Sequence, residues 1–481
     1  MAPTTTASAN SWGFFLDGKW LSDGETFEVL APHDRSMVVG IGHRATAAHA
    51  DAAVQASQRA FETTRKLPSY ERQRVLREIS EGIRSRREEF ARLLALEAGK
   101  PIKTARVEVD RAIFTFAVAA EEALRITGEW LPLDWQPSTA GRSAIVRRFA
   151  LGPILAITPF NFPANLVAHK VAPAIAAGCT MVLKPAPQTP LTALLLAEVV
   201  ERSGWPQGGF NVLPLSNPDA ERLVSDDRLK MLSFTGSGAV GWALKSKSGK
   251  KKVALELGGN AGVIVHSDWD LDDAAKRCVQ GGFAYAGQAC ISVQRIFVQR
   301  GVEEQFLAKL VEGVKKLKVG DPLDEMTDVG PMINEDAARR ARSWIEEAVV
   351  SGAKVVTGGT RRGPFLEPTV LTHTKPEMKV SCQEVFAPVV AVEPYDDFDE
   401  AIGQVNASPY GLQAGVFTRD AKLLFKAFEE LEVGGVMAGD TSSFRIDHMP
   451  YGGVKESGMG REGLRYAIEE MTEPRILVLN F

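Results

Sequence analysis

The chain contains little cysteine: four residues in 481, at positions 179, 278, 290 and 382. No two of them form a CxxC pair or stand at zinc-ligand spacing, and the seven histidines include no HExxH pattern. The sequence therefore predicts no metal site. It also favours free thiols in a reducing cytoplasm over a disulfide framework.

Long apolar runs and an excess of positive charge are missing as well. No apolar run reaches the roughly 18–20 residues of a membrane span. The N-terminal MAPTTTASANS lacks the basic and apolar regions of a secretory signal. A formal net charge of −4 leaves no basic footprint for nucleic acid or an anionic membrane. We therefore expect a cytoplasmic protein whose partners include neither a membrane nor a nucleic acid.

The sequence does contain a regular alternation of helical and β-branched apolar runs. Such runs alternate between residues 153 and 265 and again between 270 and 438, after a largely helical stretch from 47 to 126 that includes a helical pattern over 69–98. This alternation predicts an α/β fold with a doubly wound parallel sheet, whose ligands bind at the carboxyl ends of the strands. The length predicts two or three domains, with a boundary near Leu257–Gly259.

The stretch Gly281–Arg295, GGFAYAGQACISVQR, places Cys290 where a helical run ends and a β-branched run begins. A thiol at such a junction, held by a turn at Gly287, is accessible to a small molecule. A lone cysteine is more often a small buried hydrophobe, and we interpret Cys179 and Cys278 in that way. Cys290 becomes a candidate nucleophile only together with three further stretches, TPFNFP, ELGGN and EVFAP.

The segment Gly236–Gly241, GSGAVG, satisfies GxGxxG between a predicted strand and a predicted helix. It predicts a dinucleotide whose phosphates bind at a helix N-terminus. Glu256 follows 20 residues later, where this fingerprint expects a ribose ligand. However, the fingerprint normally belongs to the first strand of its fold, and several predicted strands precede it here. A second interpretation of Glu256 therefore stays open.

Six short motifs occur in a fixed order along the chain: TPFNFP, KPAPQTP, FTGS, ELGGN, GQAC and EVFAP, followed by GGVKESGMGREG. Taken together, they resemble the aldehyde dehydrogenase superfamily over nearly the whole sequence. The resemblance implies a Rossmann-like cofactor domain (12–127 and 148–257), an α/β catalytic domain (258–446) and a β-hairpin oligomerisation element (128–147 and 447–481). It also implies a homodimer or homotetramer.

The chemistry of aldehyde oxidation explains the residues in these motifs. A thiolate at Cys290 would add to the aldehyde carbonyl as a thiohemiacetal, and hydride loss would leave a thioester. The Asn161 amide and the backbone N–H of Cys290 would stabilise the oxyanion. Glu256 would then act as the base that activates water for hydrolysis.

The same resemblance implies contacts to NAD or NADP. Lys184, which we also group with the catalytic residues, would hold the adenosine ribose, Ser237 the pyrophosphate and Glu384 the nicotinamide ribose. Further cofactor contacts are expected from Ile157, Phe160, Gly236 and Phe386. Many NAD-preferring members read KPAE, whereas this chain has Pro187 in place of the glutamate. The preference between NAD and NADP is therefore open, and we expect use of both.

The substrate is the least certain inference from the sequence. TSSFRIDHMPYGG, RYAIEEMTE and CISVQR look most like a subgroup that includes lactaldehyde, non-phosphorylating glyceraldehyde-3-phosphate and phosphonoacetaldehyde dehydrogenases. We therefore expect a short polar or anionic aldehyde. The residues expected to line the aldehyde tunnel are Phe162, Ala289, Ile291, Phe444 and Tyr451. The candidates for a positive counter-charge are Arg111, Arg295 and Arg445.

Two other functions remain to be weighed. A CoA-acylating semialdehyde dehydrogenase would share the fold, but such relatives tend to lack a base at the position of Glu256. A non-catalytic binding or structural protein is the alternative from another class. The presence of Cys290, Asn161 and Glu256 argues against it.

Overall fold

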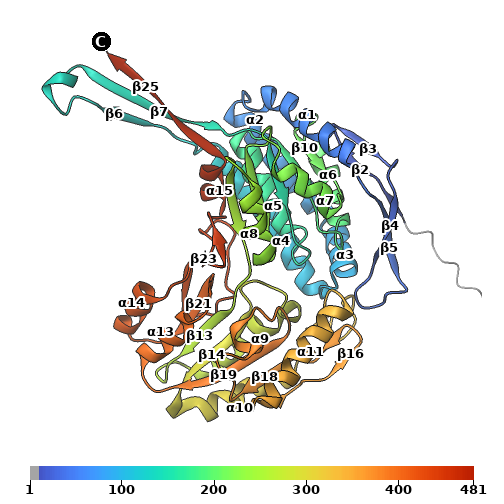
Figure 1. The fold of residues 1–481 in the computed structure, drawn as a ribbon, viewed down its shortest axis with the longest axis vertical. Helices are drawn as coiled ribbons and strands as arrows, with labels where there is room; N and C mark the ends of the chain where they lie inside the picture. The colour runs from blue at the N-terminus through green and yellow to red at the C-terminus, as the bar shows by residue number, and fades with distance from the viewer. Residues whose placement is uncertain (1–9, 481) are drawn as a thin grey trace, which may run out of the picture.

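Two β-sheets organise the computed structural model, which describes residues 10–480. The sheets lie one above the other in Figure 1, and a long arm projects from the upper body. The segment 1–9, where the sequence shows no secretory-signal pattern, and Phe481 lie outside the described residues. Within residues 10–480, no helix combines the length and apolar character needed to cross a membrane.

The first sheet has eight strands in the order β24-β12-β11-β8-β9-β10-β2-β3. Its five central strands are parallel: β12 (Lys252–Glu256), β11 (Met231–Thr235), β8 (Ile154–Ile157), β9 (Met181–Lys184) and β10 (Phe210–Val212). The edge strands are antiparallel: β2 (Phe14–Leu16), β3 (Lys19–Leu21) and β24 (Gly458–Met459). Every residue of β8 and β9 is buried, as expected for parallel strands covered by helices on both faces.

Helices connect these strands and cover the sheet. They are α5 (Asn165–Ala177), α6 (Leu191–Arg202), α7 (Asn217–Val224) and α8 (Gly238–Lys247). The N-terminal helices α1 (Ala47–Thr64), α2 (Ser69–Ser85), α3 (Arg87–Ala98) and α4 (Ile102–Ala123) complete the upper body (Figure 1). All thirteen residues of α5 are buried, because α2, α4 and α15 pack around this helix.

The helical pattern expected over 69–98 is present as two helices, α2 and α3, with a break at a single residue. Arg86 leaves the helical conformation, with φ −112° and ψ 20°, and separates α2 from α3. Its guanidinium forms ion pairs with Glu89 in α3 and Glu198 in α6. Helical periodicity continues across the break in the sequence, so only the packing of α3 against α6 reveals it.

The second sheet has seven strands in the order β15-β18-β19-β14-β13-β21-β22. These are β15 (Lys354–Thr357), β18 (Thr369–Thr372), β19 (Val389–Tyr395), β14 (Val293–Gln299), β13 (Ala261–Val265), β21 (Gln413–Phe417) and β22 (Gly435–Ala438), all parallel except β15. Its helices are α9 (Leu271–Phe283), α10 (Glu303–Lys315), α11 (Glu335–Val350), α13 (Phe398–Asn406) and α14 (Ala421–Glu430). The strand–helix alternation predicted from the sequence is therefore present in both bodies.

Several short elements complete the described chain. A small sheet contains β1 (Ser11–Trp12), β4 (Thr26–Leu30) and β5 (Val38–His43). Short pairs are formed by β16 (Arg361–Arg362) with β17 (Phe365–Leu366) and by β20 (Tyr410–Gly411) with β23 (Val454–Lys455). The remaining pieces are α12 (Lys379–Cys382) and 3-10 turns at Pro137–Thr139, Ala284–Gly287 and Arg300–Val302.

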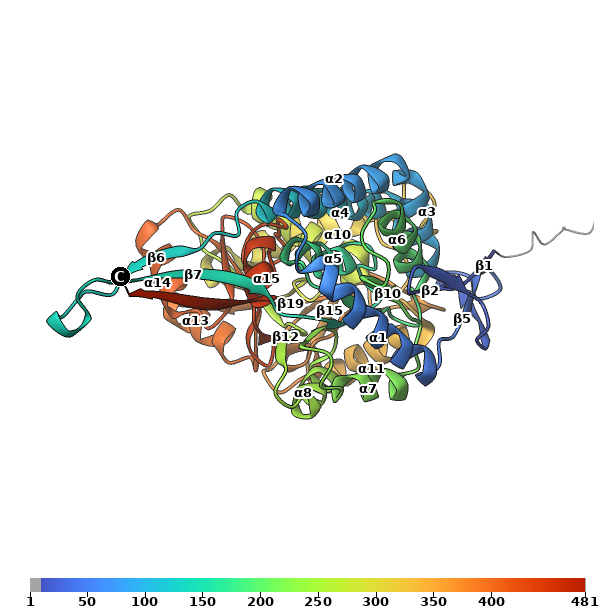
Figure 2. The ribbon, with the colours of Figure 1, turned by 90° about the horizontal axis from the view of Figure 1, so that it is seen from above.

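The arm is a three-stranded sheet made of β6 (Glu129–Pro132), β7 (Arg142–Ala150) and β25 (Thr472–Asn480). Figures 1 and 2 show it extending beyond the body of the molecule, with the C-terminal strand alongside β7. Only part of 447–481 lies in this arm. The strand β24 pairs with β12 at the edge of the first sheet, and α15 (Leu464–Glu470) packs against α5 and α4.

Candidate active site

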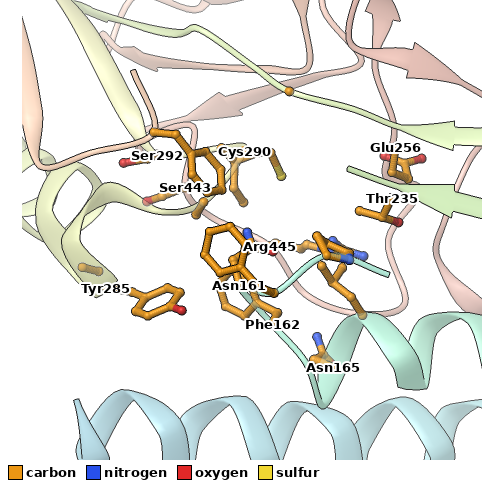
Figure 3. Close-up of a pocket in the computed structure, with 18 of the residues that line it drawn as sticks. Asn161, Phe162, Asn165, Thr235, Glu256, Tyr285, Cys290, Ser292, Ser443 and Arg445 are labelled. Atoms are coloured by element: carbon orange, nitrogen blue, oxygen red, sulfur yellow. The ribbon is translucent and has the colours of Figure 1, made fainter. Parts of the chain in front are cut away.

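A cavity of about 600 Å³ is lined by residues from both bodies. The chain passes from the first sheet to the second over residues 257–260, because β12 ends at Glu256 and β13 begins at Ala261. Figure 3 shows Glu256 and Thr235 on one side of this cavity, Cys290 on another, and Asn161 between them. Three stretches that lie far apart in the sequence therefore meet around one space.

Cys290 occupies the predicted junction, between the turn at Ala284–Gly287 and β14. The turn is tightly bent: Tyr285, Ala286 and Gly287 all have positive φ, at 50°, 53° and 68°. A Cβ on Gly287 would lie 2.2 Å from the carbonyl oxygen of Ala387, so only glycine fits there. The Cys290 sulfur is 2.7 Å from the hydroxyl of Tyr451. Burial raises the pKa of the Cys290 thiol to about 12, and the Tyr451 hydroxyl opposes that rise.

The Asn161 side chain is buried and lines the cavity. Its Nδ2 donates to the carbonyl of Gln288 at 3.0 Å, in the turn before Cys290, which leaves its second N–H for another acceptor. Lys100 donates to the main-chain carbonyl of Asn161 at 2.8 Å. The Lys100 ammonium is itself fully buried, pairs with Glu108 and lies over the ring of Phe162 at 3.7 Å.

Glu256 lines the same cavity and is only 4% exposed. Neither of its carboxylate oxygens has a hydrogen-bond partner among residues 10–480. Burial and the nearby charge of Glu462 raise the pKa of Glu256 well above its ordinary value. An unpartnered carboxylate of raised pKa, facing the cavity of a thiol, is arranged as a proton acceptor. The GxGxxG spacing therefore does not identify a ribose ligand here.

Glu462 belongs to a paired cluster beside Glu256. Arg445 donates to Glu462 at 2.8 Å, and the Lys170 ammonium lies 3.6 Å from its other oxygen. Burial would raise the pKa of Glu462, but Lys170 and Arg445 lower it to about 2. Sequence reasoning missed Lys100, Glu108, Lys170 and Glu462. Glu108 and Lys170 lie in helices and Lys100 and Glu462 stand just before helices; charged residues at such positions are normally solvated, and no local pattern reveals that these four are buried.

Most of the residues expected to bind the cofactor line this same cavity. Glu384 accepts from the backbone N–H of Gly259 at 2.9 Å, and burial raises its pKa to about 7. The rings of Phe160 and Phe386 meet edge to face, with centroids 5.9 Å apart. Gly236 and Ser237 line the cavity at the start of α8. The Ser237 side chain does not cap that helix, so its first N–H groups point to an anion site.

These groups fit a dinucleotide. Its pyrophosphate would be held by the N-terminus of α8, and a ribose hydroxyl would donate to Glu384. Lys184 and Ile157 pair in register at the ends of β9 and β8, outside the lining described for the cavity. The Lys184 ammonium donates to Asn217 at 3.0 Å, and burial lowers its pKa to about 8. Lys184 therefore lies outside the lining that contains Cys290 and Glu256, and its inclusion among the catalytic residues is corrected.

The expected tunnel residues divide into two groups. Phe162, Ala289, Ile291 and Tyr451 line the cavity, as do Arg111 and Arg445. Phe444 is 47% exposed and does not belong to the lining within the described chain. We therefore correct its assignment, because neighbouring Ser443 and Arg445 face the cavity instead.

The expectation for Arg295 is also wrong. Its guanidinium donates to the backbone carbonyls of Asn260, Gln404 and Val405. It borders a separate cavity of about 280 Å³ next to α13. Arg295 lies within β14, where side chains alternate between the faces of the sheet, and its own face is turned toward α13.

The comparisons with known proteins agree with this geometry. The model of the aldehyde dehydrogenase family matches residues 20–477. A 3-sulfolactaldehyde dehydrogenase of Priestia aryabhattai is 47% identical over 478 residues, which is 99% of this chain and 100% of that protein. Among solved structures, aldehyde dehydrogenase 21 from Physcomitrella patens, in complex with the reaction product succinate, is 44% identical with a TM-score of 0.97. The match covers 98% of this chain and 99% of that one.

A second solved structure shows the cofactor in a similar chain. The glyceraldehyde-3-phosphate dehydrogenase GapN from Methanocaldococcus jannaschii, complexed with NADP, is 38% identical with a TM-score of 0.92. The match covers 96% of this chain and 100% of that one. The α/β fold class and the resemblance inferred from the motifs are thereby confirmed. Matched over almost its whole length, the chain belongs to the aldehyde dehydrogenase family of NAD(P)-dependent oxidoreductases.

Proposed function

We propose that this enzyme oxidises a short anionic aldehyde to its carboxylic acid, with Cys290 as nucleophile and Glu256 as base. The observation that carries the proposal is that Cys290, Asn161 and the unpartnered carboxylate of Glu256 line one cavity. The groups for each step are thereby held in place before the substrate binds.

In the first step the Cys290 thiol loses its proton to water, the thiolate adds to the aldehyde carbon, and the carbonyl oxygen takes up the electron pair. The free N–H of Asn161 and the backbone N–H of Cys290 donate to this oxyanion. When the oxyanion collapses, a bound NAD(P)⁺ supplies the acceptor for the hydride. The substrate is left as a thioester on Cys290.

In the second step Glu256 takes a proton from water, and the resulting hydroxide adds to the thioester carbon. The C–S bond then breaks, Cys290 leaves as thiolate, and the acid is released. The raised pKa of Glu256 makes its carboxylate a stronger base than an exposed glutamate. A base at this position also disfavours the CoA-acylating alternative, in which a thiol replaces water.

Two arginines support an anionic substrate. Arg111 and Arg445 both line the cavity, and the Nε of Arg445 is buried without a partner in the described structure. Arg111 is held by Asp447 through two hydrogen bonds and stays partly exposed. The similar proteins carry names that point the same way, since sulfolactaldehyde and succinate are both anionic.

The proposal extends to the cofactor and the assembly. Pro187 is exposed beyond β9 and carries no charge against a 2′-phosphate, so we expect use of both NAD and NADP. The first sheet with its helices would bind the cofactor, and the second would supply the nucleophile.

The arm exposes Trp130, Trp135 and the run Ile476–Val478, which supports a homodimer or homotetramer. The free thiols favour a cytoplasmic location.

The test is a panel of short aldehydes, neutral and anionic, assayed with both coenzymes for the wild-type enzyme and for Cys290→Ala. We expect the highest kcat/KM for a short aldehyde that carries a carboxylate, sulfonate or phosphate, and no oxidation by Cys290→Ala. Turnover by that variant would refute the nucleophile, and preference for long aliphatic or aromatic aldehydes would refute the substrate class.

A further inference from the structure

A tyrosine hydroxyl lies directly against the proposed nucleophile. The Oη of Tyr451 is 2.7 Å from the Cys290 sulfur, and the Tyr451 side chain is only 3% exposed. The backbone of Tyr451 exchanges two hydrogen bonds with Glu462, at 3.0 and 2.6 Å. These bonds hold the main chain of Tyr451, and burial of the ring restricts the side chain that carries the hydroxyl.

A positive charge lies over the ring of the same tyrosine. The guanidinium carbon of Arg445 is 3.6 Å from the ring centroid of Tyr451, within the range of a cation–π contact. Arg445 donates a hydrogen bond to Glu462 at 2.8 Å, which holds its guanidinium in place. The Arg445 guanidinium therefore contacts the Tyr451 ring, and the Tyr451 hydroxyl in turn contacts the Cys290 sulfur. A cation over a phenol attracts electron density from the ring and makes its O–H a stronger donor.

We propose that Tyr451 is a further catalytic residue, whose hydroxyl donates a hydrogen bond to the Cys290 thiolate, strengthened by Arg445 over its ring. The proposal rests on Cys290 being the nucleophile. A thiolate carries no hydrogen, so in the reactive form the hydroxyl must be the donor. Tyr451 therefore stabilises the charged form of the sulfur and holds it in the cavity.

The surrounding charges make such a donor necessary. Burial disfavours the Cys290 thiolate, and the carboxylates of Glu384 and Glu256 disfavour it further. The Tyr451 hydroxyl and Arg445 act in the opposite direction. Burial and the sulfur charge also raise the pKa of Tyr451 itself, so the hydroxyl keeps its proton and remains a donor.

The experiment is the pH dependence of Cys290 alkylation by iodoacetamide in the full-length enzyme. The thiolate displaces iodide and forms a thioether, and peptide mass spectrometry separates Cys290 from Cys382. Tyr451→Phe removes one oxygen and keeps the ring. Because a hydrogen bond to a charged group is lost, we expect the apparent thiol pKa to rise by about 1–2 units, which is measured as an alkylation rate about 10- to 100-fold lower at each pH.

The matched control is Tyr285→Phe. Tyr285 is buried in the lining of the same cavity, but its hydroxyl donates to the carbonyl of Ala98 at 2.8 Å. We expect the thiol pKa to stay unchanged in this variant. An unchanged thiol pKa in Tyr451→Phe, or an equal rise in Tyr285→Phe, would overturn the proposal. Alkylation needs no turnover, so this result is separate from the Cys290→Ala assay that tests the nucleophile.

Discussion

Two buried carboxylates, Glu256 in the cavity lining and Asp447 behind the lining residues Arg111 and Asn165, have opposite surroundings. Asp447 accepts hydrogen bonds from Arg111, Asn165 and His169, between 2.7 and 3.2 Å. Although burial opposes it, the hydrogen bonds and charges of His169 and Arg111 lower the pKa of Asp447 far below its ordinary value. Glu256 has no partner within residues 10–480, and burial raises its pKa. A structural carboxylate is fully paired, whereas a carboxylate that must take a proton is kept unpaired.

The largest effect is expected when the unpaired carboxylate is removed. In Glu256→Gln the thioester forms but loses its base, so we expect kcat to fall about 10²- to 10⁴-fold. Rapid-mixing absorbance should still show a first burst of NAD(P)H equal to the number of active sites. Because Glu256 makes no hydrogen bond in the described chain and its buried charge costs stability, the melting temperature should not fall. Loss of the burst together with turnover would place Glu256 in an earlier step.

Removing one partner of the buried Lys100–Glu108 ion pair should have the opposite effect and reduce folding stability strongly. Lys100→Met leaves Glu108 charged and buried, so we expect a loss of about 3–5 kcal/mol in the free energy of unfolding. Denaturant titration measures it. The neutral double variant Lys100→Met/Glu108→Gln should recover part of that stability. We also expect Lys100→Met to lower kcat, because the Asn161 carbonyl loses its hydrogen bond from Lys100. The double variant should not recover kcat, because that hydrogen bond is still absent. Full recovery of both would make the pair purely structural.

Asp447→Asn should be milder, because the amide still accepts a hydrogen bond. Arg111 and His169 lose a charged partner, and we expect about 2–3 kcal/mol of destabilisation in the same titration. Since Arg111 would no longer be held in place, KM for an anionic aldehyde should rise more than KM for a neutral one of equal length. Equal changes in KM for both aldehydes would show that Arg111 does not bind the anionic group of the substrate.

The smallest effect is a pair of opposite pH dependences. The pKa of Asp447 is lowered on folding, so its contribution to stability is present above about pH 4 and is lost as pH falls toward the folded pKa. The pKa of Glu256 is raised on folding, so its charge costs stability increasingly as pH rises from about 4 toward its folded pKa. Relative to wild type, Glu256→Gln should therefore gain stability with rising pH, and Asp447→Asn should gain with falling pH. Denaturant midpoints between pH 3 and 8 provide the measurement, and parallel profiles would contradict the comparison.

The sequence predicted the catalytic end of the cavity more reliably than the substrate end. Cys290, Asn161 and Glu256 each lie within a short motif at the end of a predicted element, where side chains reach a shared edge. Arg295 and Phe444 are candidates by residue type alone, as a positive charge and an aromatic ring. Residue type alone does not determine the face on which a side chain lies, and the structure placed both elsewhere.

The charged clusters behind the site could not be predicted in this way. Lys100, Lys170 and Glu462 stand in segments where charged residues are normally solvated. Their burial depends on partners that folding brings together: Lys100 donates to the carbonyl of Asn161, 61 positions away, and Lys170 pairs with Glu462 just before α15, where that helix packs against α5. Helical periodicity likewise could not show the break at Arg86, which depends on a partner in α6.

The sequence by itself determined the alternation of elements, the order of the motifs and the family, because these depend on local spacing and residue type. The tertiary structure alone decided which charges are paired. The free energy of a buried charge depends on the groups around it, and folding brings those groups together from distant parts of the chain.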